Sequence, residues 1–267
     1  MPVGVRDIVR NPVKEKLARG ELVASMTARL VTGIEIVRIA KTAGFDTLYI
    51  DLEHSSFSVE TTGQICLMAL EAGIPALVRV PANTPEYISR VLDGGALGVI
   101  APGVRSAAEA RAVVAAAKYP PAGERGLSAG LPQLGFRTLP AKETMPALND
   151  ATMVIVQFES KAALDAMEEI VAVDGVDLVL IGTNDLTADL GIPGEYDHPK
   201  VRDAYSRTIE ACRKRGKHVG VGGLGSRPDL VAQFVKMGAR YVSTGTDLAF
   251  LVAACTQRAK QVHDIEV

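Results

Sequence analysis

The 267-residue sequence contains no tryptophan, and aromatic residues make up only 4% of it. Its formal net charge at pH 7 is −2, which provides no basic surface for binding nucleic acid or an acidic membrane. No apolar run approaches the roughly 20 residues of a membrane-spanning helix, and the amino end lacks the charged-then-apolar pattern of a secretory signal. We therefore expect a soluble, cytoplasmic globular protein without nucleic-acid or membrane partners.

Cysteine is also scarce. The three cysteines, Cys66, Cys212 and Cys255, are an odd number and show no CxxC spacing. This pattern is typical of reduced thiols and argues against disulfide bonds or a cysteine-ligated metal. The sequence also lacks a GxGxxG motif after its first predicted strand and any GxxxxGK[ST] motif, so dinucleotide-binding and P-loop functions have no support.

A repeating unit runs through the chain without repeated sequence. A helical pattern ends at a glycine, and a short apolar strand follows that ends in polar residues. Glycine after the last helical turn adopts the left-handed conformation that closes a helix. The clearest example is the predicted helix 34–43, which ends at Gly44 and precedes the strand 47–50. Strands this apolar on both faces are typical of a parallel sheet covered by helices.

Eight such strands are predicted, at residues 23–26, 47–50, 76–80, 97–100, 153–156, 177–181, 218–221 and 240–243. Eight strand–helix units indicate a single domain, residues 1–267, folded as a closed (β/α)8 TIM barrel. The competing fold is an open, doubly wound sheet, which seldom needs so many units.

Two segments, residues 12–19 and 118–150, fall outside the repeat. Residues 12–19 are predicted to form a short amphipathic helix that plugs or flanks the barrel bottom. Residues 118–150 are longer than an ordinary connection, and they are either a functional loop or a surface excursion with one helical turn near 145–148. The carboxyl-terminal helix, about residues 247–262, carries an apolar face that is expected to pack on a neighbouring subunit.

The titratable residues gather where strands end, and in a barrel these ends converge on one mouth. Glu159 and Asp185, which follow adjacent strands, are the natural pair to hold a divalent cation such as Mg²⁺ or Mn²⁺, because hard cations prefer oxygen ligands. Each carboxylate alone also fits a structural role as an acid beside a helix start.

Three further residues have both a structural and a functional interpretation. Arg79 lies in an apolar context, where it either forms a salt bridge with Asp51 or Glu53 or faces a substrate carboxylate or enolate oxygen. His54 is either a core histidine or a general base, and Asp51, three residues earlier, is placed to orient its imidazole. Glu53 is expected to be an indirect partner of Arg79 or of a metal-bound water.

The lysines argue against imine chemistry. A Schiff-base aldolase needs a desolvated lysine at the barrel mouth. Most lysines fall on predicted helices or at the opposite strand ends, and the nearest candidate, Lys161, begins a predicted helix. Metal-assisted chemistry is therefore favoured.

Several motifs, taken in order and at their spacing, resemble the HpcH/HpaI aldolases over residues 12–255. They are Asp51-Leu-Glu-His54, Arg79-Val-Pro81, Pro102-Gly-Val, Ser106-Ala-Ala-Glu-Ala110, Tyr119-Pro-Pro with Arg125-Gly126, Gln157-Phe-Glu159, Ile181-Gly-Thr-Asn-Asp-Leu186 and Leu190-Gly191. The resemblance implies a class II aldolase that cleaves a 4-hydroxy-2-oxo acid into pyruvate, or an analogue such as hydroxypyruvate, and an aldehyde.

The resemblance also implies roles for individual residues. Glu159 and Asp185 would bind the divalent ion (Mg²⁺, Mn²⁺ or Co²⁺), Arg79 would stabilise the pyruvate enolate, and His54 with Asp51 would handle the proton. The pyruvyl end would be held by a final group of residues, namely Gln157, Gly182, Thr183 and Asn184. In the family the carboxyl-terminal region is exchanged between subunits of a hexamer built as a trimer of dimers, so a homo-oligomer is expected.

Two departures from the commonest family members affect the expected substrate. Asn184 replaces a small apolar residue, and the segment 127–136 differs from the usual loop after Arg-Gly; together they bring the chain closer to the macrophomate synthase branch. The alternatives within enzymes are an oxaloacetate decarboxylase, a macrophomate-synthase-like enzyme and a CoA-thioester lyase, although no basic cluster for CoA lies near the mouth. A catalytically silent barrel that serves as a scaffold is the alternative from another class.

Overall fold

The computed structural model describes residues 4–266, and its eight parallel strands close into a barrel in the order β1 to β8. Each strand begins and ends within two residues of its predicted bounds, and the closed order confirms the (β/α)8 barrel over the open sheet. The strands are β1 Val23–Ala28, β2 Thr47–Asp51, β3 Ala76–Arg79, β4 Gly98–Ala101, β5 Met153–Phe158, β6 Leu178–Gly182, β7 His218–Gly222 and β8 Tyr241–Ser243.

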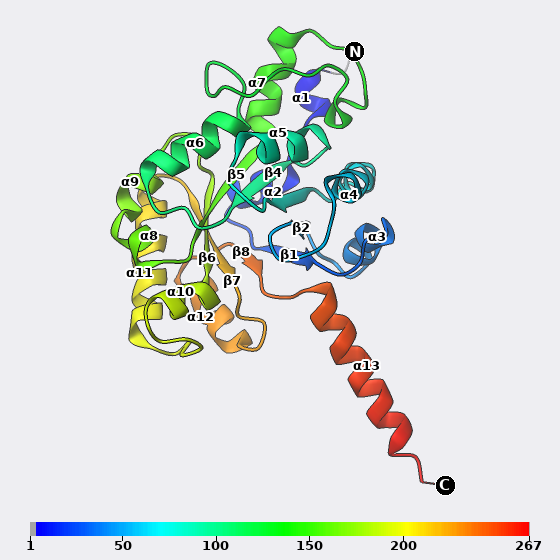
Figure 1. The fold of residues 1–267 in the computed structure, drawn as a ribbon, viewed down its shortest axis with the longest axis vertical. Coiled ribbons are helices and arrows are strands. Elements are labelled where there is room, and N and C mark those ends of the chain that lie inside the picture. The colour runs from blue at the N-terminus through cyan, green and yellow to red at the C-terminus, as the bar shows by residue number, and fades with distance from the viewer. Residues whose placement is uncertain (1–3, 267) are drawn as a thin grey trace.

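Most of the helices surround the barrel and cover the outer faces of the strands (Figure 1). The helices of the described chain are α1 Val5–Ile8, α2 Pro12–Ala18, α3 Glu35–Thr42, α4 Val59–Ala72, α5 Pro85–Asp93, α6 Ala107–Ala117, α7 Ala141–Ala151, α8 Lys161–Asp165, α9 Met167–Val171, α10 Thr183–Asp189, α11 Pro199–Lys214, α12 Pro228–Met237 and α13 Asp247–His263, with a 3-10 turn at Pro132–Leu134.

Two apolar layers hold the barrel together. The larger one lies between the strands and the surrounding helices. The smaller one fills the barrel interior, where Leu77, Ile155 and Leu180 pack with Val13 and Leu17 of α2. Helix α2 is therefore a plug at the amino end of the barrel, which was one of the two placements predicted for residues 12–19. Asn11 caps this plug, because its side chain accepts the N–H of Val13.

The long segment 118–150 also lies at the amino end, so it does not border the barrel mouth. Lys118 donates to the carbonyl of Thr152 just before β5, and Gln133 donates to the carbonyl of Ala96 just before β4. The single helical turn predicted near 145–148 is the longer helix α7, and it packs with α1 in a separate small core. Within one chain the segment therefore lies apart from the mouth, and its interpretation as a functional loop, like the bearing of the stretch 127–136 on the substrate, stays a prediction.

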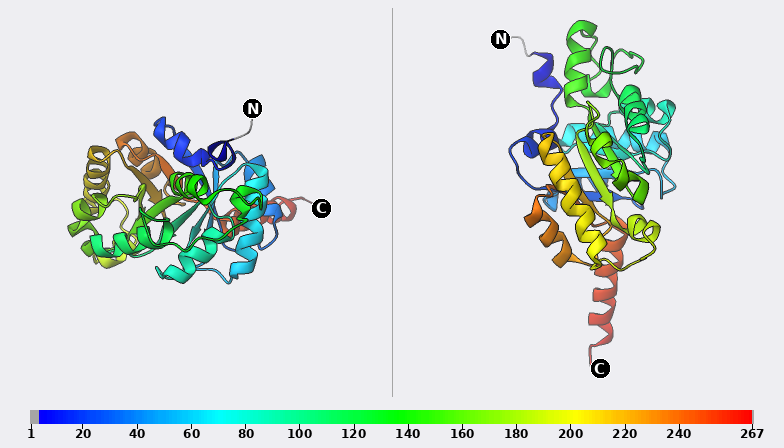
Figure 2. Two further views of the ribbon diagram at one scale, coloured as in Figure 1. Left: turned by 90° about the horizontal axis from the view of Figure 1, so that it is seen from above. Right: turned by 90° about the vertical axis from the view of Figure 1, so that its left-hand side faces the viewer.

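Helix α13 points away from the barrel instead of packing against it (Figures 1 and 2). Apart from Asp247 at its start, its residues are exposed, and Leu251 and Val252 expose more than half of their surface. Packing of this face on a neighbouring subunit stays a prediction. Among the described residues, no helix is long and apolar enough to cross a membrane. All three cysteines are free; Cys66 and Cys212 are buried and Cys255 is exposed.

Candidate active site

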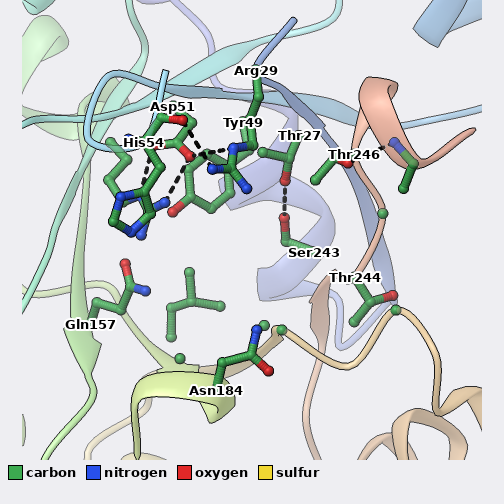
Figure 3. A pocket seen from close by; sticks show the side chains of 18 of the residues that line it. Thr27, Arg29, Tyr49, Asp51, His54, Gln157, Asn184, Ser243, Thr244 and Thr246 are labelled. Atoms are coloured by element: carbon green, nitrogen blue, oxygen red, sulfur yellow. Dashed lines mark hydrogen bonds and ion pairs between the residues drawn. The ribbon is translucent and has the colours of Figure 1, made fainter. Parts of the chain in front are cut away.

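A cavity of about 290 Å³ opens at the carboxyl ends of the strands (Figure 3). Seven of the nine predicted site residues line it: Asp51, His54, Arg79, Gln157, Gly182, Asn184 and Asp185. The other two, Glu159 and Thr183, lie just outside the lining. Small-molecule sites are typically concave and have a few convergent polar groups, and this cavity matches that description.

Asp51 and Arg79 form a buried ion pair on neighbouring strands. Their backbones are paired in register, and Arg79 donates from Nε and Nη2 to the two Asp51 oxygens at 2.9 and 2.7 Å. Arg79 Nη1 also lies 2.7 Å from Glu53 Oε2. Burial would raise the pKa of Asp51, but the hydrogen bonds and charge of Arg79 outweigh it and hold that pKa below its ordinary value. The two acids therefore fix the guanidinium in one orientation.

His54 is oriented differently from the prediction. Asp51 Oδ1 accepts the backbone N–H groups of Glu53 and His54, at 3.1 and 3.2 Å, and within the described residues it makes no hydrogen bond to the imidazole. The acid that approaches the ring is Glu53, whose Oε2 lies 3.7 Å from His54 Nε2. Asp51 was expected to orient the imidazole. Instead it accepts backbone N–H groups of the loop that carries His54, and both of its carboxylate oxygens also accept hydrogen bonds from Arg79. The His54 side chain is half exposed, which excludes the core-histidine interpretation.

Glu159 is a carboxylate held partly out of water. Its Oε2 accepts the backbone N–H of Gly103 at 2.9 Å, and Oε1 accepts from the Gln157 side chain. Burial raises the pKa of Glu159 to about 7, and the negative charges of Asp185 and Glu53 add to this rise. The contribution of Asp185 to this rise means that the two predicted metal ligands are close enough to repel each other.

Gly182 is required by close packing at the end of β6. A Cβ atom at this position would lie 2.7 Å from Glu159 Oε1 and 2.8 Å from Gln157 Nε2. The glycine therefore gives these two side chains room to cross the strand end. The sequence alone does not reveal this crossing, because it depends on how neighbouring strands are placed.

Thr183 and Asn184 have mainly structural partners. Thr183 is fully buried, and its hydroxyl bonds to Tyr205 and to the carbonyl of Gly222 at 2.8 and 2.7 Å. Its side chain is therefore not available to a substrate, which leaves only its backbone for the predicted role. Asn184 lines the cavity, with Oδ1 accepting from the Tyr196 hydroxyl at 2.9 Å.

The residues present fit a divalent cation with two protein carboxylates. No group of three or more His, Cys, Asp or Glu side chains converges within the described residues. Mg²⁺-type ions, however, are usually held by one or two carboxylates and complete their shell with water and substrate. Gln157 Oε1 is buried without a hydrogen-bond partner in the described chain, and burial raises the pKa of Glu159 to about 7. A cation between these residues would stabilise the ionised form of Glu159.

The opposite wall of the cavity was missed by sequence reasoning. It comes from the ends of β1 and β8 and consists of Thr27, Arg29, Ser243, Thr244 and Thr246. Arg29 stands one residue after β1, so the rule that strand ends carry function would have identified it. Hydroxyl residues after β8 have no comparable signal, because Ser and Thr are equally common at helix caps.

Comparison with known proteins places this site in a family. The model of the HpcH/HpaI aldolase/citrate lyase family matches residues 32–254. The 4-hydroxy-4-methyl-2-oxoglutarate aldolase of Hapsidospora irregularis is 35% identical over 260 residues, which is 96% of each chain. The 2-keto-3-deoxy-L-rhamnonate aldolase of Escherichia coli K12 is 36% identical over 252 residues, covering 94% of this chain and 92% of that one.

Solved structures of other proteins are also similar to this chain. An HpcH/HpaI aldolase from Desulfitobacterium hafniense superimposes with a TM-score of 0.89 at 33% identity, covering 95% of this chain and 97% of that one. Macrophomate synthase superimposes with a TM-score of 0.77 at 22% identity, covering 97% of this chain and 90% of that one, and shows a shared fold.

Proposed function

The chain belongs to the HpcH/HpaI aldolase/citrate lyase family, and on this premise we propose that it is a metal-dependent carbon–carbon lyase. The reaction is reversible cleavage of a 4-hydroxy-2-oxo acid into pyruvate, or an analogue such as hydroxypyruvate, and an aldehyde. One observation carries the proposal: a desolvated carboxylate, Glu159, shares its surroundings with Asp185 beside a cavity that Arg79 lines.

Glu159 and Asp185 would hold the divalent ion, and Mg²⁺, Mn²⁺ and Co²⁺ all suit such oxygen ligands. When bound, the ion supplies a Lewis acid that polarises the 2-oxo group. The neighbouring Gln157 side chain would orient the pyruvyl end, since it lines the cavity and keeps an unpaired oxygen in the described structure.

Arg79 would stabilise the negative charge of the enolate oxygen. Its guanidinium is already oriented by Asp51 and Glu53, so little reorganisation is needed when charge develops. Electrostatic stabilisation of this kind usually contributes more to the rate than any other effect, and one donor is typically worth about 10²–10³ in rate.

His54 would take the proton. It accepts the proton of the C4 hydroxyl, the C3–C4 bond breaks, and C4 leaves as the aldehyde carbonyl. The electron pair of that bond stays on the three-carbon fragment as the enolate, and protonation at C3 then gives pyruvate. The half-exposed imidazole beside Glu53 is placed to exchange protons with the cavity and with solvent.

We also propose an oligomeric state and a cellular location for the protein. Apolar residues on the exposed helix α13, including Leu248, Leu251 and Val252, support a homo-oligomer in which this helix packs on another subunit. A hexamer built as a trimer of dimers follows from the family resemblance, and a cytoplasmic location follows from the sequence composition.

An aldol-addition screen tests the function directly. Purified protein is incubated with pyruvate or hydroxypyruvate and a panel of aldehydes, before and after treatment with a chelator. We expect new 4-hydroxy-2-oxo acids that disappear with the chelator and return when Mg²⁺ or Mn²⁺ is added. Unaffected synthesis after metal removal contradicts the metal role, and absence of both synthesis and metal binding favours the silent scaffold.

A further inference from the structure

Arg29 presents a second positive charge to the cavity, on a different wall from the acids that would bind the metal. In the view of Figure 3 its guanidinium lies across the cavity from Gln157 and Asn184, between Asp51 and Thr27. Its side chain is 36% exposed, whereas that of Arg79 is 8% exposed. Arg29 is therefore accessible to a ligand, and Arg79 serves mainly the enclosed end of the site.

The backbone that carries Arg29 is held by a buried acid. Asp247, at the first position of α13, is 4% exposed and accepts the backbone N–H groups of Arg29, Leu30 and Val31 at 3.0, 3.0 and 2.8 Å. These three hydrogen bonds fix the turn after β1. A ligand would therefore meet a positioned guanidinium and not a mobile surface arginine.

The Arg29 side chain contacts two other residues and still has free hydrogen-bond donors within the described chain. Nη2 donates to the carbonyl of His54 at 2.9 Å, and Nε lies 3.3 Å from Asp51 Oδ2. Asp51 already receives two shorter hydrogen bonds from Arg79. Within residues 4–266, Nη1 of Arg29 has no hydrogen-bond or ion-pair partner. Arg29 lines the cavity, and its Nη1 thus keeps its donors.

The wall around Arg29 suits an anion. Apart from Asp51, which is paired, it presents hydroxyl groups and backbone, and the hydroxyls of Thr27 and Ser243 bond to each other at 3.0 Å. Among described residues, the remaining acid that lines the cavity is Asp185, which comes from the end of β6. A carboxylate beside Arg29 would therefore meet donors without facing an unpaired acid.

We propose that Arg29 binds a second carboxylate, carried by the carbonyl compound that leaves in the cleavage reaction. The inference rests on the proposed aldolase function and narrows its substrate class to 4-hydroxy-2-oxo dicarboxylic acids. Cleavage yields pyruvate and an oxo acid, and the reverse reaction joins C3 of the pyruvate enolate to the carbonyl carbon of that oxo acid, whose oxygen takes up a proton. Guanidinium suits this task because its planar fork matches a carboxylate.

If Arg29 serves only to hold the loop of His54 by donating to the His54 carbonyl, a different result is expected. Loss of that support would impair every acceptor alike, since His54 acts on all of them. Loss of a carboxylate contact would impair only acceptors that carry the charge. Comparison of a charged and an uncharged acceptor of similar size separates the two roles.

The experiment measures aldol addition of pyruvate to glyoxylate, which carries a carboxylate, and to glycolaldehyde, which carries a hydroxymethyl group in its place. Wild type, Arg29→Gln, Arg29→Lys and the control Arg38→Gln are compared at saturating Mg²⁺. Arg38 lies exposed on α3, outside the cavity lining. Exchange of the pyruvate methyl protons with deuterium is followed on the same samples, because it reports the enolate without any acceptor.

We expect wild type to prefer glyoxylate, and Arg29→Gln to lower kcat/KM for glyoxylate by about 10- to 100-fold, as expected for a lost charge-assisted hydrogen bond. Its activity with glycolaldehyde should change little, Arg29→Lys should retain part of the preference, and Arg38→Gln should match wild type. Equal losses with both acceptors, or a wild type that exchanges deuterium without preferring glyoxylate, overturn the inference alone. A wild type that neither exchanges deuterium nor forms product overturns the proposed function as well.

Discussion

The two ends of the barrel use their polar groups differently. At the amino end, Asn11 donates to the carbonyls of Leu97 and Ala151 at 3.0 and 2.8 Å, and Asp46 pairs with Lys16 while accepting the N–H of Ala24. At the carboxyl end, Gln157 keeps an unpaired buried oxygen and Glu159 remains a desolvated acid.

This contrast separates groups that stabilise the fold from groups that serve a ligand. A buried polar group without a partner costs about 1–3 kcal/mol. At the amino end, the Tyr119 hydroxyl, Arg125 Nε and Gln133 Oε1 are also buried without a hydrogen-bond partner among the described residues, so unpaired atoms alone do not mark a site. At the mouth they occur together with a cavity and a desolvated acid, and substitutions at the two ends should therefore have different consequences.

The largest effect is expected from Arg79→Lys. The substitution keeps a positive charge beside fully buried Asp51 but loses the planar fork, so the turnover number should fall by about 10²–10³. Steady-state kinetics and thermal unfolding on the same sample check this. Arg79→Ala is less informative, because it removes the main partner of buried Asp51 and leaves only the longer contact with Arg29, and breaking a buried ion pair typically costs about 3–5 kcal/mol of stability. Near-normal turnover of a folded lysine variant would contradict the role of Arg79.

The reverse outcome is expected at the amino end. Asn11→Ala removes the cap of α2 and two bonds to buried carbonyls, so the free energy of unfolding should fall by about 1–3 kcal/mol. Turnover of the folded enzyme should stay unchanged. Chemical denaturation measures the first quantity and initial rates the second, and a large change in turnover would break the separation between the two ends.

A smaller, pH-dependent effect is expected at Glu159 in chelator-treated protein. Its pKa is raised to about 7 in the folded chain, so the native state holds a proton that the unfolded chain releases near pH 4.5. Stability linked to this group is present at low pH and is lost as pH rises from about 4.5 through 7. Glu159→Gln should therefore raise the melting temperature at pH 8 and not at pH 4, a difference of order 1 kcal/mol. Equal melting curves at pH 8 would show that Glu159 is not desolvated.

The smallest effect is expected at Lys161, near the mouth but not part of it. Its side chain is 67% exposed, and its ammonium pairs with Asp165 four residues later. Lys161→Ala should leave aldol activity intact and change stability by no more than about 0.5 kcal/mol. Borohydride treatment in the presence of pyruvate, followed by mass measurement, offers a second check, since trapping of pyruvate on a lysine would support imine chemistry.

Much of the fold was predictable because the signal is local. Most strands are apolar runs bounded by a helix-closing glycine on one side and polar residues on the other. This pattern, together with the apolar runs 23–26 and 153–156, located all eight strands, and the amphipathic pattern of residues 12–19 indicated helix α2. Placement of residues 118–150 was not predictable, since it depends on contacts such as Gln133 with the carbonyls before β4. The composition of α13 does not indicate that this helix projects away from the barrel.

The sequence predicted which strand ends form the site, but not which side chains pair with one another there. Asp51, Glu53, Arg79 and His54 can pair in several ways, and packing decides that both acids pair with Arg79 while only Glu53 approaches the His54 ring. The importance of Gly182 becomes visible only when Glu159 and Gln157 are seen to cross it. Arg29 was not predicted as a site residue, because a single arginine in a loop is usually a solvated surface residue.

The central claim is that acids from β5 and β6 hold a cation with which the chain turns pyruvate into its enolate. The most direct test follows the methyl protons of pyruvate by NMR in deuterium oxide, with no aldehyde present. We expect rapid exchange with Mg²⁺ or Mn²⁺, none after chelation, and none in Asp185→Asn. Exchange that persists without metal, or that fails with every divalent ion offered to the folded wild type, contradicts the claim.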